Sequence, residues 1–185
     1  MRFLLSAWIL LSGFCLRAQD FVTSDGLVSF FGEKPFESVR ADNHEVKGVI
    51  DIETGQVEFH TLVKSFRFRN KTIERAFDDK YMESEKYPKM DFVGKIIDLS
   101  GIDFNKPGVY PIVVEGQFTI HNVARPVSHP GTLTVSENGL IAKSQFSVQP
   151  DGFKVNVPRL FGRRLVKEIN VSVVMNFVAE KAKEK

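Results

Sequence analysis

The sequence predicts an all-β protein, an antiparallel barrel of about eight strands with one helix, over residues 70–86, packed across it. Three observations lead to this fold. Apolar and polar residues alternate at period two along most of the chain, as they do in strands with one buried face. One segment instead follows the four-residue spacing of a helix. Outside the charged tail at residues 180–185, no repeat, linker or low-complexity stretch divides the chain.

The expected strands follow one another at short intervals along the chain. The tripeptides Thr54-Gly55-Gln56 and Glu137-Asn138-Gly139 provide turns between neighbours, and the second is typical of a hairpin. Eight to ten strands linked in this way favour a closed or nearly closed antiparallel barrel. In chain order the alternating segments are 27–31, 46–52, 57–59, 66–68, 92–99, 110–120, 132–135, 140–148, 153–157 and 169–177.

The helical segment begins at Asn70, whose side chain can cap a helix. Ile73, Phe77 and Tyr81 then fall on one face, and Pro88 ends the segment. Because this apolar stripe needs a partner surface, we expect the helix to lie across the side or the mouth of the barrel. An eight-stranded barrel has room inside for side chains or for one small ligand.

Residues 1–18 have the pattern of a signal peptide, and residues 19–185 then form a single barrel domain. Met1-Arg2 precedes an apolar run that ends at Leu16, and Ala18 is a small residue suited to cleavage. The apolar run is too short for a transmembrane helix. The sequence therefore predicts export to the periplasm as a soluble protein, with a retained N-terminal anchor as the alternative.

Composition narrows the function further. The chain has 185 residues, and 43% of them are hydrophobic and 26% charged, which is a globular balance. Removal of residues 1–18 takes two of the 25 basic residues, so 23 basic residues balance 23 acidic ones. A neutral chain gives no electrostatic reason to bind nucleic acid. The same removal takes the only cysteine, Cys15, which excludes disulfide scaffolds and thiol nucleophiles.

Three separated stretches resemble the YceI-like family of exported lipid-binding proteins. They are residues 43–51 (NHEVKGVID), residues 80–96 (KYMESEKYPKMDFVGKI) and residues 114–127 (VEGQFTIHNVARPV). The resemblance extends from about residue 42 to residue 177 with the motifs in the family's order. It implies a lipocalin-like barrel whose apolar lumen holds a long isoprenoid or fatty chain. It also implies carriage or storage rather than an established reaction.

With this resemblance, the many phenylalanines are interpreted as the lining of a lumen, and a solid core of packed rings is the alternative. Under that alternative the protein is an envelope interaction or stress module without lipid cargo. The lumen residues that we expect are Phe59, Phe66, Phe68, Phe92, Val114, Phe118, Ile120, Phe146 and Phe153.

The candidates for contact with the ligand's head group are Tyr81, His121 and Arg125, since all three lie within or beside the family motifs. Two basic clusters are interpreted as a solvated strand face, and transient contact with a phosphate group or an anionic membrane surface is the alternative. The sequence leaves a homodimer open. The two clusters are Lys64, Arg67, Arg69, Lys71 and Arg75, and Arg159, Arg163 and Arg164.

We expect no enzyme activity, no cofactor and no metal. The sequence has neither a nucleophile elbow nor a glycine-rich phosphate loop. No two of the four histidines, His44, His60, His121 and His129, have the spacing of a metal-binding pair. A hydrolase or isomerase that pairs His121 with a carboxylate is the remaining enzymatic alternative. A small outer-membrane barrel is a further alternative, against which the helix and the charged C-terminal tail argue.

Overall fold

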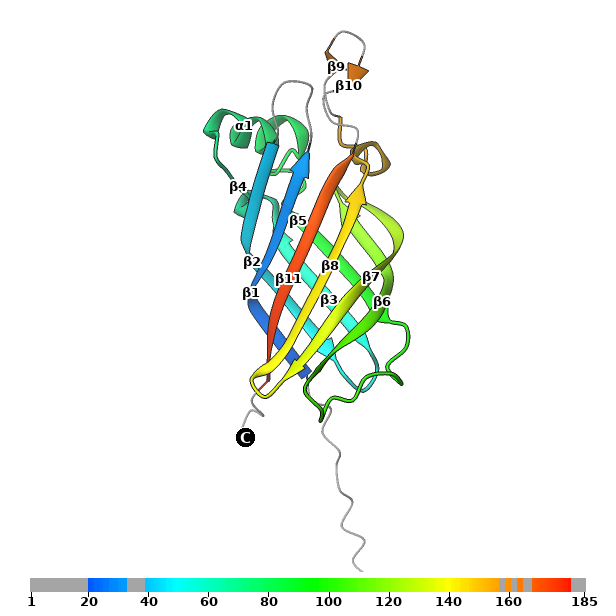
Figure 1. Cartoon of the computed structure of the whole chain (residues 1–185). Helices are drawn as coiled ribbons and strands as arrows, with labels where there is room; N and C mark the ends of the chain where they lie inside the picture. Colours follow the sequence, from blue (N-terminus) through cyan, green and yellow to red (C-terminus); the bar gives the residue numbers. More distant parts are fainter. Residues whose placement is uncertain (1–19, 33–38, 157–158, 161–162, 165–167, 181–185) are drawn as a thin grey trace, which may run out of the picture.

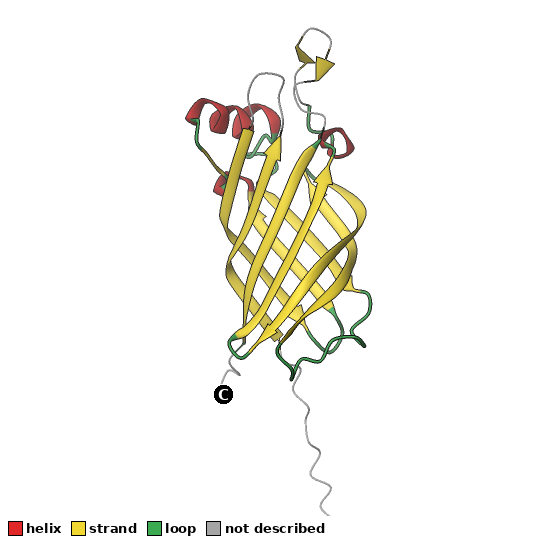
Figure 2. Ribbon diagram, in the orientation of Figure 1, coloured by secondary structure: helices red, strands yellow, loops and turns green. Residues whose placement is uncertain are grey.

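The structure is a computed structural model that describes residues 20–32, 39–156, 159–160, 163–164 and 168–180. Eight long strands of this part form an antiparallel barrel (Figures 1 and 2), which confirms the predicted fold class. The predicted signal peptide, residues 1–18, lies outside the described residues. The eight strands are β1 Asp20–Gly32, β2 Val39–Asp51, β3 Gln56–Leu62, β5 Lys89–Ile96, β6 Gly108–Ile120, β7 Val123–Ser136, β8 Gly139–Val148 and β11 Ile169–Ala179.

The strands pair in the order β1-β11-β8-β7-β6-β5-β3-β2, and β1 pairs again with β2, so the sheet closes on itself. All eight of these pairings are antiparallel. The short strand β4, Arg67–Phe68, pairs with β2 at the end of the barrel that carries the helix. Two further short strands, β9 Arg159–Leu160 and β10 Arg163–Arg164, pair with each other.

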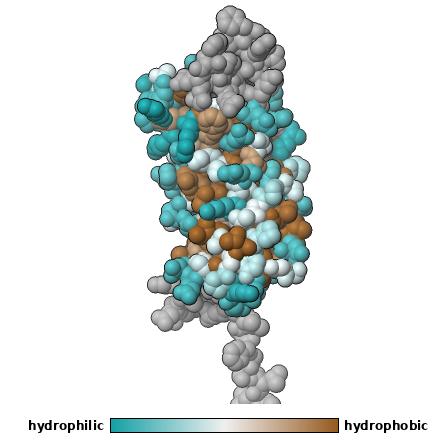
Figure 3. All heavy atoms as spheres, viewed as in Figure 1, coloured by the Kyte–Doolittle hydropathy of each residue, from teal (hydrophilic) through white to brown (hydrophobic). Residues whose placement is uncertain are grey.

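Alternation within each strand separates an apolar interior from a polar outer wall. In β6, Ile112 and Ile120 are buried, whereas Val113, Glu115 and Gln117 are exposed. The outer wall carries some apolar residues as well, and on the face shown in Figure 3 they are scattered among hydrophilic ones. The period-two pattern of the sequence therefore identifies correctly which side chains face inward.

Packed apolar side chains fill the barrel at the end where β7 and β8 join. Leu133 and Phe177 belong to this core and are at most 2% exposed. In the wall beside it, Gly94 and Gly116 lie opposite each other in β5 and β6, and the ring of Phe92 covers both. A Cβ atom on Gly116 would lie 2.3 Å from the carbonyl oxygen of the facing strand. The two glycines thus make room for the aromatic ring inside the barrel.

The helix is shorter than the predicted residues 70–86. An α-helix, α1, covers Lys71–Ala76 and continues as a π-helical turn, η2, over Phe77–Tyr81. The backbone N–H of Met82 donates to the carbonyl of Phe77, and Glu83 then has a positive φ of 45°. Because a left-handed residue cannot continue a right-handed helix, the segment ends there and not at Pro88.

The predicted strand over residues 153–157 is wrong. Pro150–Phe153 forms a short 3-10 helix, η3, and Lys154 follows in the left-handed region with a φ of 58°. Proline at the first position suits a helical turn and not a ladder, since it has no N–H to donate. Phe153 is nevertheless buried, as expected, because η3 folds over the open end of the barrel. Val157 lies outside the described residues.

Candidate ligand-binding site

Two apolar cavities lie inside the barrel. The lower cavity, between the packed core and the middle of the barrel, has a volume of about 140 Å³. The upper cavity, beneath the helical segment, has a volume of about 150 Å³. An apolar cavity of about 150 Å³ stays free of water and admits a ligand the size of benzene. Each cavity therefore has the size of a small hydrocarbon fragment.

All nine residues predicted to line a lumen border one or both cavities. Phe59, Phe92, Val114 and Phe146 lie around the lower cavity alone. The residues at the upper cavity alone are Phe68, Ile120 and Phe153, and those shared by both cavities are Phe66 and Phe118. The strand pattern thus assembles the predicted set around a common interior space.

A neck of five apolar residues separates the two cavities. Each of the five borders both cavities, so together they determine whether one ligand can occupy both. Methionine has a flexible, unbranched side chain, whereas packed aromatic rings have little freedom to move. Met90 is therefore the most adaptable member of the neck. The neck residues are Val28, Phe66, Met90, Phe118 and Val171.

The helical segment closes the upper cavity with the stripe that the sequence predicted. Ile73, Phe77 and Tyr81 all border this cavity. The ring of Phe77 lies 5.0–5.8 Å from the rings of Phe68, Phe30 and Phe66, measured between centroids. Such aromatic pairs contribute about 0.5–1.5 kcal/mol each. The cover of the upper cavity is therefore held mainly by ring contacts.

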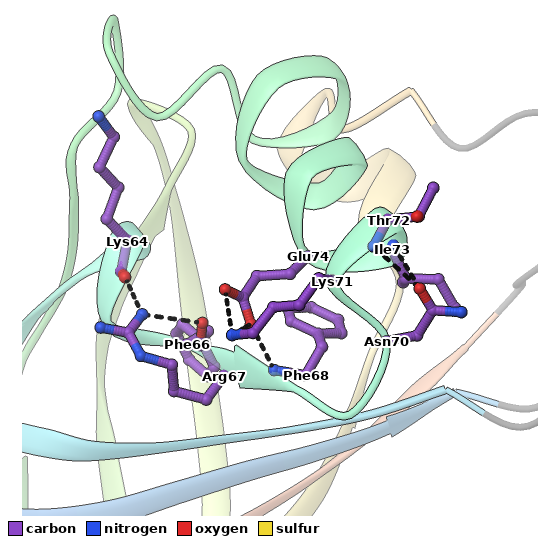
Figure 4. Close-up of polar contacts among 9 residues, drawn as sticks. All are labelled: Lys64, Phe66, Arg67, Phe68, Asn70, Lys71, Thr72, Ile73 and Glu74. Carbon is purple, nitrogen blue, oxygen red and sulfur yellow. Dashed lines mark hydrogen bonds and ion pairs between the residues drawn. The ribbon is translucent and has the colours of Figure 1, made fainter.

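Polar contacts fix the start of this helical segment to β4 (Figure 4). The side chain of Asn70 accepts hydrogen bonds from the backbone N–H groups of Thr72 and Ile73, at 2.9 and 3.4 Å. The carboxylate of Glu74 accepts from the backbone N–H of Phe68 at 2.9 Å and pairs with Lys71. The segment is thus anchored at its first turn, outside the hydrogen-bond ladder of the barrel.

The three predicted head-group residues do not come together. Tyr81 borders the upper cavity, but neither His121 nor Arg125 borders either cavity. The Nε atom of Arg125 donates to the carbonyl of Gly152 at 2.7 Å, which fastens η3 to β7. Arg125 therefore has a structural contact at the upper end of the barrel.

His121 lies in the two-residue turn between β6 and β7. His121 and Asn122 both have positive φ values, 51° and 58°, as the tightest hairpin turns require. The Nε2 atom of His121 lies 3.0 Å from a carboxylate oxygen of Glu83, and its ring lies 4.1 Å from that of Tyr87. This cluster ties the segment after the helix to the hairpin, and it lies outside both cavities.

The first basic cluster is largely occupied by local contacts. Lys64 pairs with Glu85, and this contact raises the pKa of the ammonium group and lowers the pKa of the carboxyl. Arg67 donates to the carbonyl of Lys64 at 2.6 Å (Figure 4). Arg69 is exposed, as predicted from its position next to the buried Phe68 in a pattern of period two. The side chains of the second cluster, Arg159, Arg163 and Arg164, lie outside the described part of the structure.

Sequence reasoning missed several residues of the site. Phe30 belongs to the ring cluster over the upper cavity, and Met90 belongs to the neck. His129 borders the lower cavity and stacks on Phe146, with ring centroids 4.2 Å apart. The available signal was the spacing in β7. Val127, His129 and Gly131 lie two residues apart and so share one face of the strand, and all three border the lower cavity.

The described residues contain neither a metal-ligand cluster nor a membrane-spanning helix. No group of three or more His, Cys, Asp or Glu side chains in this part is arranged to hold a metal ion. Within the same part, no helix has the length and apolar character needed to cross a membrane.

The fold and the cavities define a class of antiparallel eight-stranded barrels with interior space for an apolar ligand. The profile of the YceI-like domain matches residues 22–179, and the chain belongs to that family. Among curated proteins, none matches this chain in sequence.

Solved structures share this fold at low sequence identity. A polyisoprenoid-binding domain from Saccharophagus degradans, implicated in plant cell wall breakdown, has a TM-score of 0.71 at 12% identity. The match covers 88% of this chain and 99% of that one. BcnA from Burkholderia cenocepacia has a TM-score of 0.68 at 17% identity, with 81% and 94% covered. The YCEI protein of Campylobacter jejuni has a TM-score of 0.59 at 16% identity, with 77% and 85% covered.

Proposed function

We propose that this protein is a non-enzymatic carrier or reservoir that holds one amphiphile with an isoprenoid-like or other long chain inside its barrel. The observation that carries the proposal is the pair of apolar cavities in line, joined at a neck and covered by a helical segment. The fold shared with a polyisoprenoid-binding domain supports the same function. The signal-peptide pattern of residues 1–18 supports export of the carrier to the periplasm.

Burial of the chain supplies the affinity. Each methylene group removed from water contributes about 0.8 kcal/mol. Each cavity admits a ligand only about the size of benzene, so a longer chain must occupy both cavities and cross the neck between them. We expect Phe66, Met90 and Phe118 to change rotamer when a long chain binds, and the lumen to be wider with cargo than without it.

The helical segment serves as the gate through which the chain enters. It covers the upper cavity through Ile73, Phe77 and Tyr81 but adds no strand to the barrel. Its first turn is fixed by Asn70 and Glu74, so opening displaces the later turn while the barrel stays closed. Lid motions of this kind occur without loss of the surrounding fold.

Calorimetric titration of detergent-free protein with farnesol, a short isoprenoid alcohol, tests the proposal. We expect saturable binding of one molecule per chain with a negative heat-capacity change, the mark of apolar burial. An interaction or stress module with a packed core would give no saturable heat with farnesol or with a longer polyprenol. That result would overturn the carrier function.

A further inference from the structure

The barrel wall is open between the upper halves of β7 and β8. β7 pairs with β6 along its whole length, from Val123 to Val135. Its pairing with β8 covers only residues 131–136, opposite residues 139–144, whereas β8 stays paired with β11 as far as Val148. In Figure 1 the two strands diverge toward the end that carries the helix. Pro126 and Pro130 lie in the unpaired half of β7, where their missing N–H groups cost nothing.

His129 bridges this opening from the β7 side. Its ring stacks on that of Phe146 in β8, with centroids 4.2 Å apart and an angle of 11° between the planes. The same imidazole borders the lower cavity beside Val114 and Phe118. One face of the ring is thus packed on Phe146 while the side chain borders the cavity.

The ring nitrogens of His129 are free for a ligand. Neither has a hydrogen-bond partner among the described residues. Other inward-facing polar groups at the cavity are already bonded: Thr61 accepts from Asn43 at 2.9 Å, and Ser144 donates to the carbonyl of Pro130 at 2.8 Å. Among the described polar side chains that face inward at this cavity, His129 is therefore the one that makes no hydrogen bond.

The surroundings of His129 favour a neutral ligand group. Burial lowers the pKa of His129, so the ring is neutral at pH 7 and offers one N–H donor and one acceptor. His60, Asp91 and Lys143 also border the lower cavity, but from strand positions that alternate with the inward-facing residues. An anion beside a neutral ring would lose its hydration without gaining a counter-charge, whereas a hydroxyl or carbonyl would gain a hydrogen bond.

We propose that His129 binds the polar group of the cargo, and that this group is a neutral hydroxyl or carbonyl held in the side wall between β7 and β8. The chain of the ligand then extends past the neck into the upper cavity. This inference rests on the proposed carrier function. It places the head group at mid-barrel rather than beside Tyr81 at the mouth.

Three probes with one tail test this assignment in detergent-free protein: farnesol, farnesyl monophosphate and the hydrocarbon farnesene. The wild-type protein should bind farnesol more tightly than either of the others. His129→Phe keeps the ring stack and removes the nitrogens, so it should weaken farnesol binding about tenfold, the value of one neutral hydrogen bond, and leave farnesene unchanged. His44→Phe, the same substitution at an exposed position of β2 that borders neither cavity, is the matched control and should change neither affinity.

Two results would overturn the role of His129 while leaving the carrier function intact. One is equal farnesol affinity in the wild-type protein and in His129→Phe. The other is tighter binding of farnesyl monophosphate than of farnesol by the wild-type protein. This comparison does not depend on whether a variant folds. Failure of the wild-type protein to bind any of the three probes would overturn the carrier function itself.

Discussion

A carboxylate introduced at the neck should abolish cargo binding. Phe118 borders both cavities, and its ring makes edge-on contacts with Phe146 and Phe153, at centroid distances of 6.3 and 5.8 Å. In Phe118→Asp, a bound chain would surround the carboxyl group and force it to take up a proton. Raising a carboxyl pKa from about 3.9 to about 7 costs about 4 kcal/mol, at 1.36 kcal/mol per unit. That cost corresponds to a loss of affinity of about a thousandfold.

Gln117→Asp is the matched control for this variant. It introduces the same carboxylate one residue earlier in β6, where the side chain is exposed on the outer wall. Calorimetric titration with farnesol should give the wild-type Kd for Gln117→Asp and no measurable binding for Phe118→Asp. Lowering the pH toward 5 should restore part of the lost affinity, because the new carboxyl is then more readily protonated.

The reasoning is refuted if folded Phe118→Asp binds farnesol with the wild-type Kd, since the lumen would then not be the binding site. Circular dichroism and thermal unfolding establish whether the variant is folded. Phe118→Trp provides an apolar second variant. Its larger ring fills the neck, so we expect weaker binding of a long polyprenol. The fold should be retained, with the free energy of unfolding lowered by about 1–3 kcal/mol.

Three further predictions concern stability and are measured by thermal or urea unfolding. Gly116→Ala should destabilise the protein strongly because its Cβ would lie 2.3 Å from a backbone oxygen. Gly101→Ala is the control and should leave the stability unchanged, since Gly101 has open space around it. Equal stabilities of the two variants would contradict the close approach of β5 and β6. Asn70→Ala should cost about 1 kcal/mol through loss of the helix cap, and an unchanged unfolding midpoint would mean that the cap contributes nothing. Asp78→Asn should stabilise the fold at pH 7, since burial raises the pKa of Asp78 and its Oδ1 atom has no partner among the described residues. A raised folded-state pKa makes the charged form unfavourable, so this gain should vanish below the ordinary carboxyl pKa of about 3.9, and a gain that persists there would refute the cause.

Local pattern was sufficient for most of the fold and for the apolar inner face of the barrel wall. Alternation at period two placed Phe92 and Phe118 inside the barrel because the wall is a sheet with one apolar face. The four-residue spacing of Ile73 and Phe77 identified the face of the helix that covers the upper cavity. Both signals depend only on near neighbours in the chain, which is why they can be interpreted without the structure.

Other features depend on contacts that no local pattern encodes. The apolar alternation from Phe153 onward resembles a strand, but Pro150 and the left-handed Lys154 make it a short helical turn. The opening between β7 and β8 depends on how far two strands pair, and Pro126 and Pro130 were its nearby signs. The two-residue spacing between Val127 and His129 could have placed His129 on the inner face of the barrel. Its free nitrogens become evident only when the surrounding partners are known.

Mass spectrometry of the protein, purified without detergent from the cells that produce it, shows directly whether the barrel holds a lipid. The carrier account predicts one dominant amphiphile with a long chain, bound at about one molecule per barrel and released on extraction with organic solvent. A protein that is empty after this purification, and stays empty when offered neutral long-chain amphiphiles, would contradict the account. Its phenylalanines would then be a packed core and not the lining of a binding site.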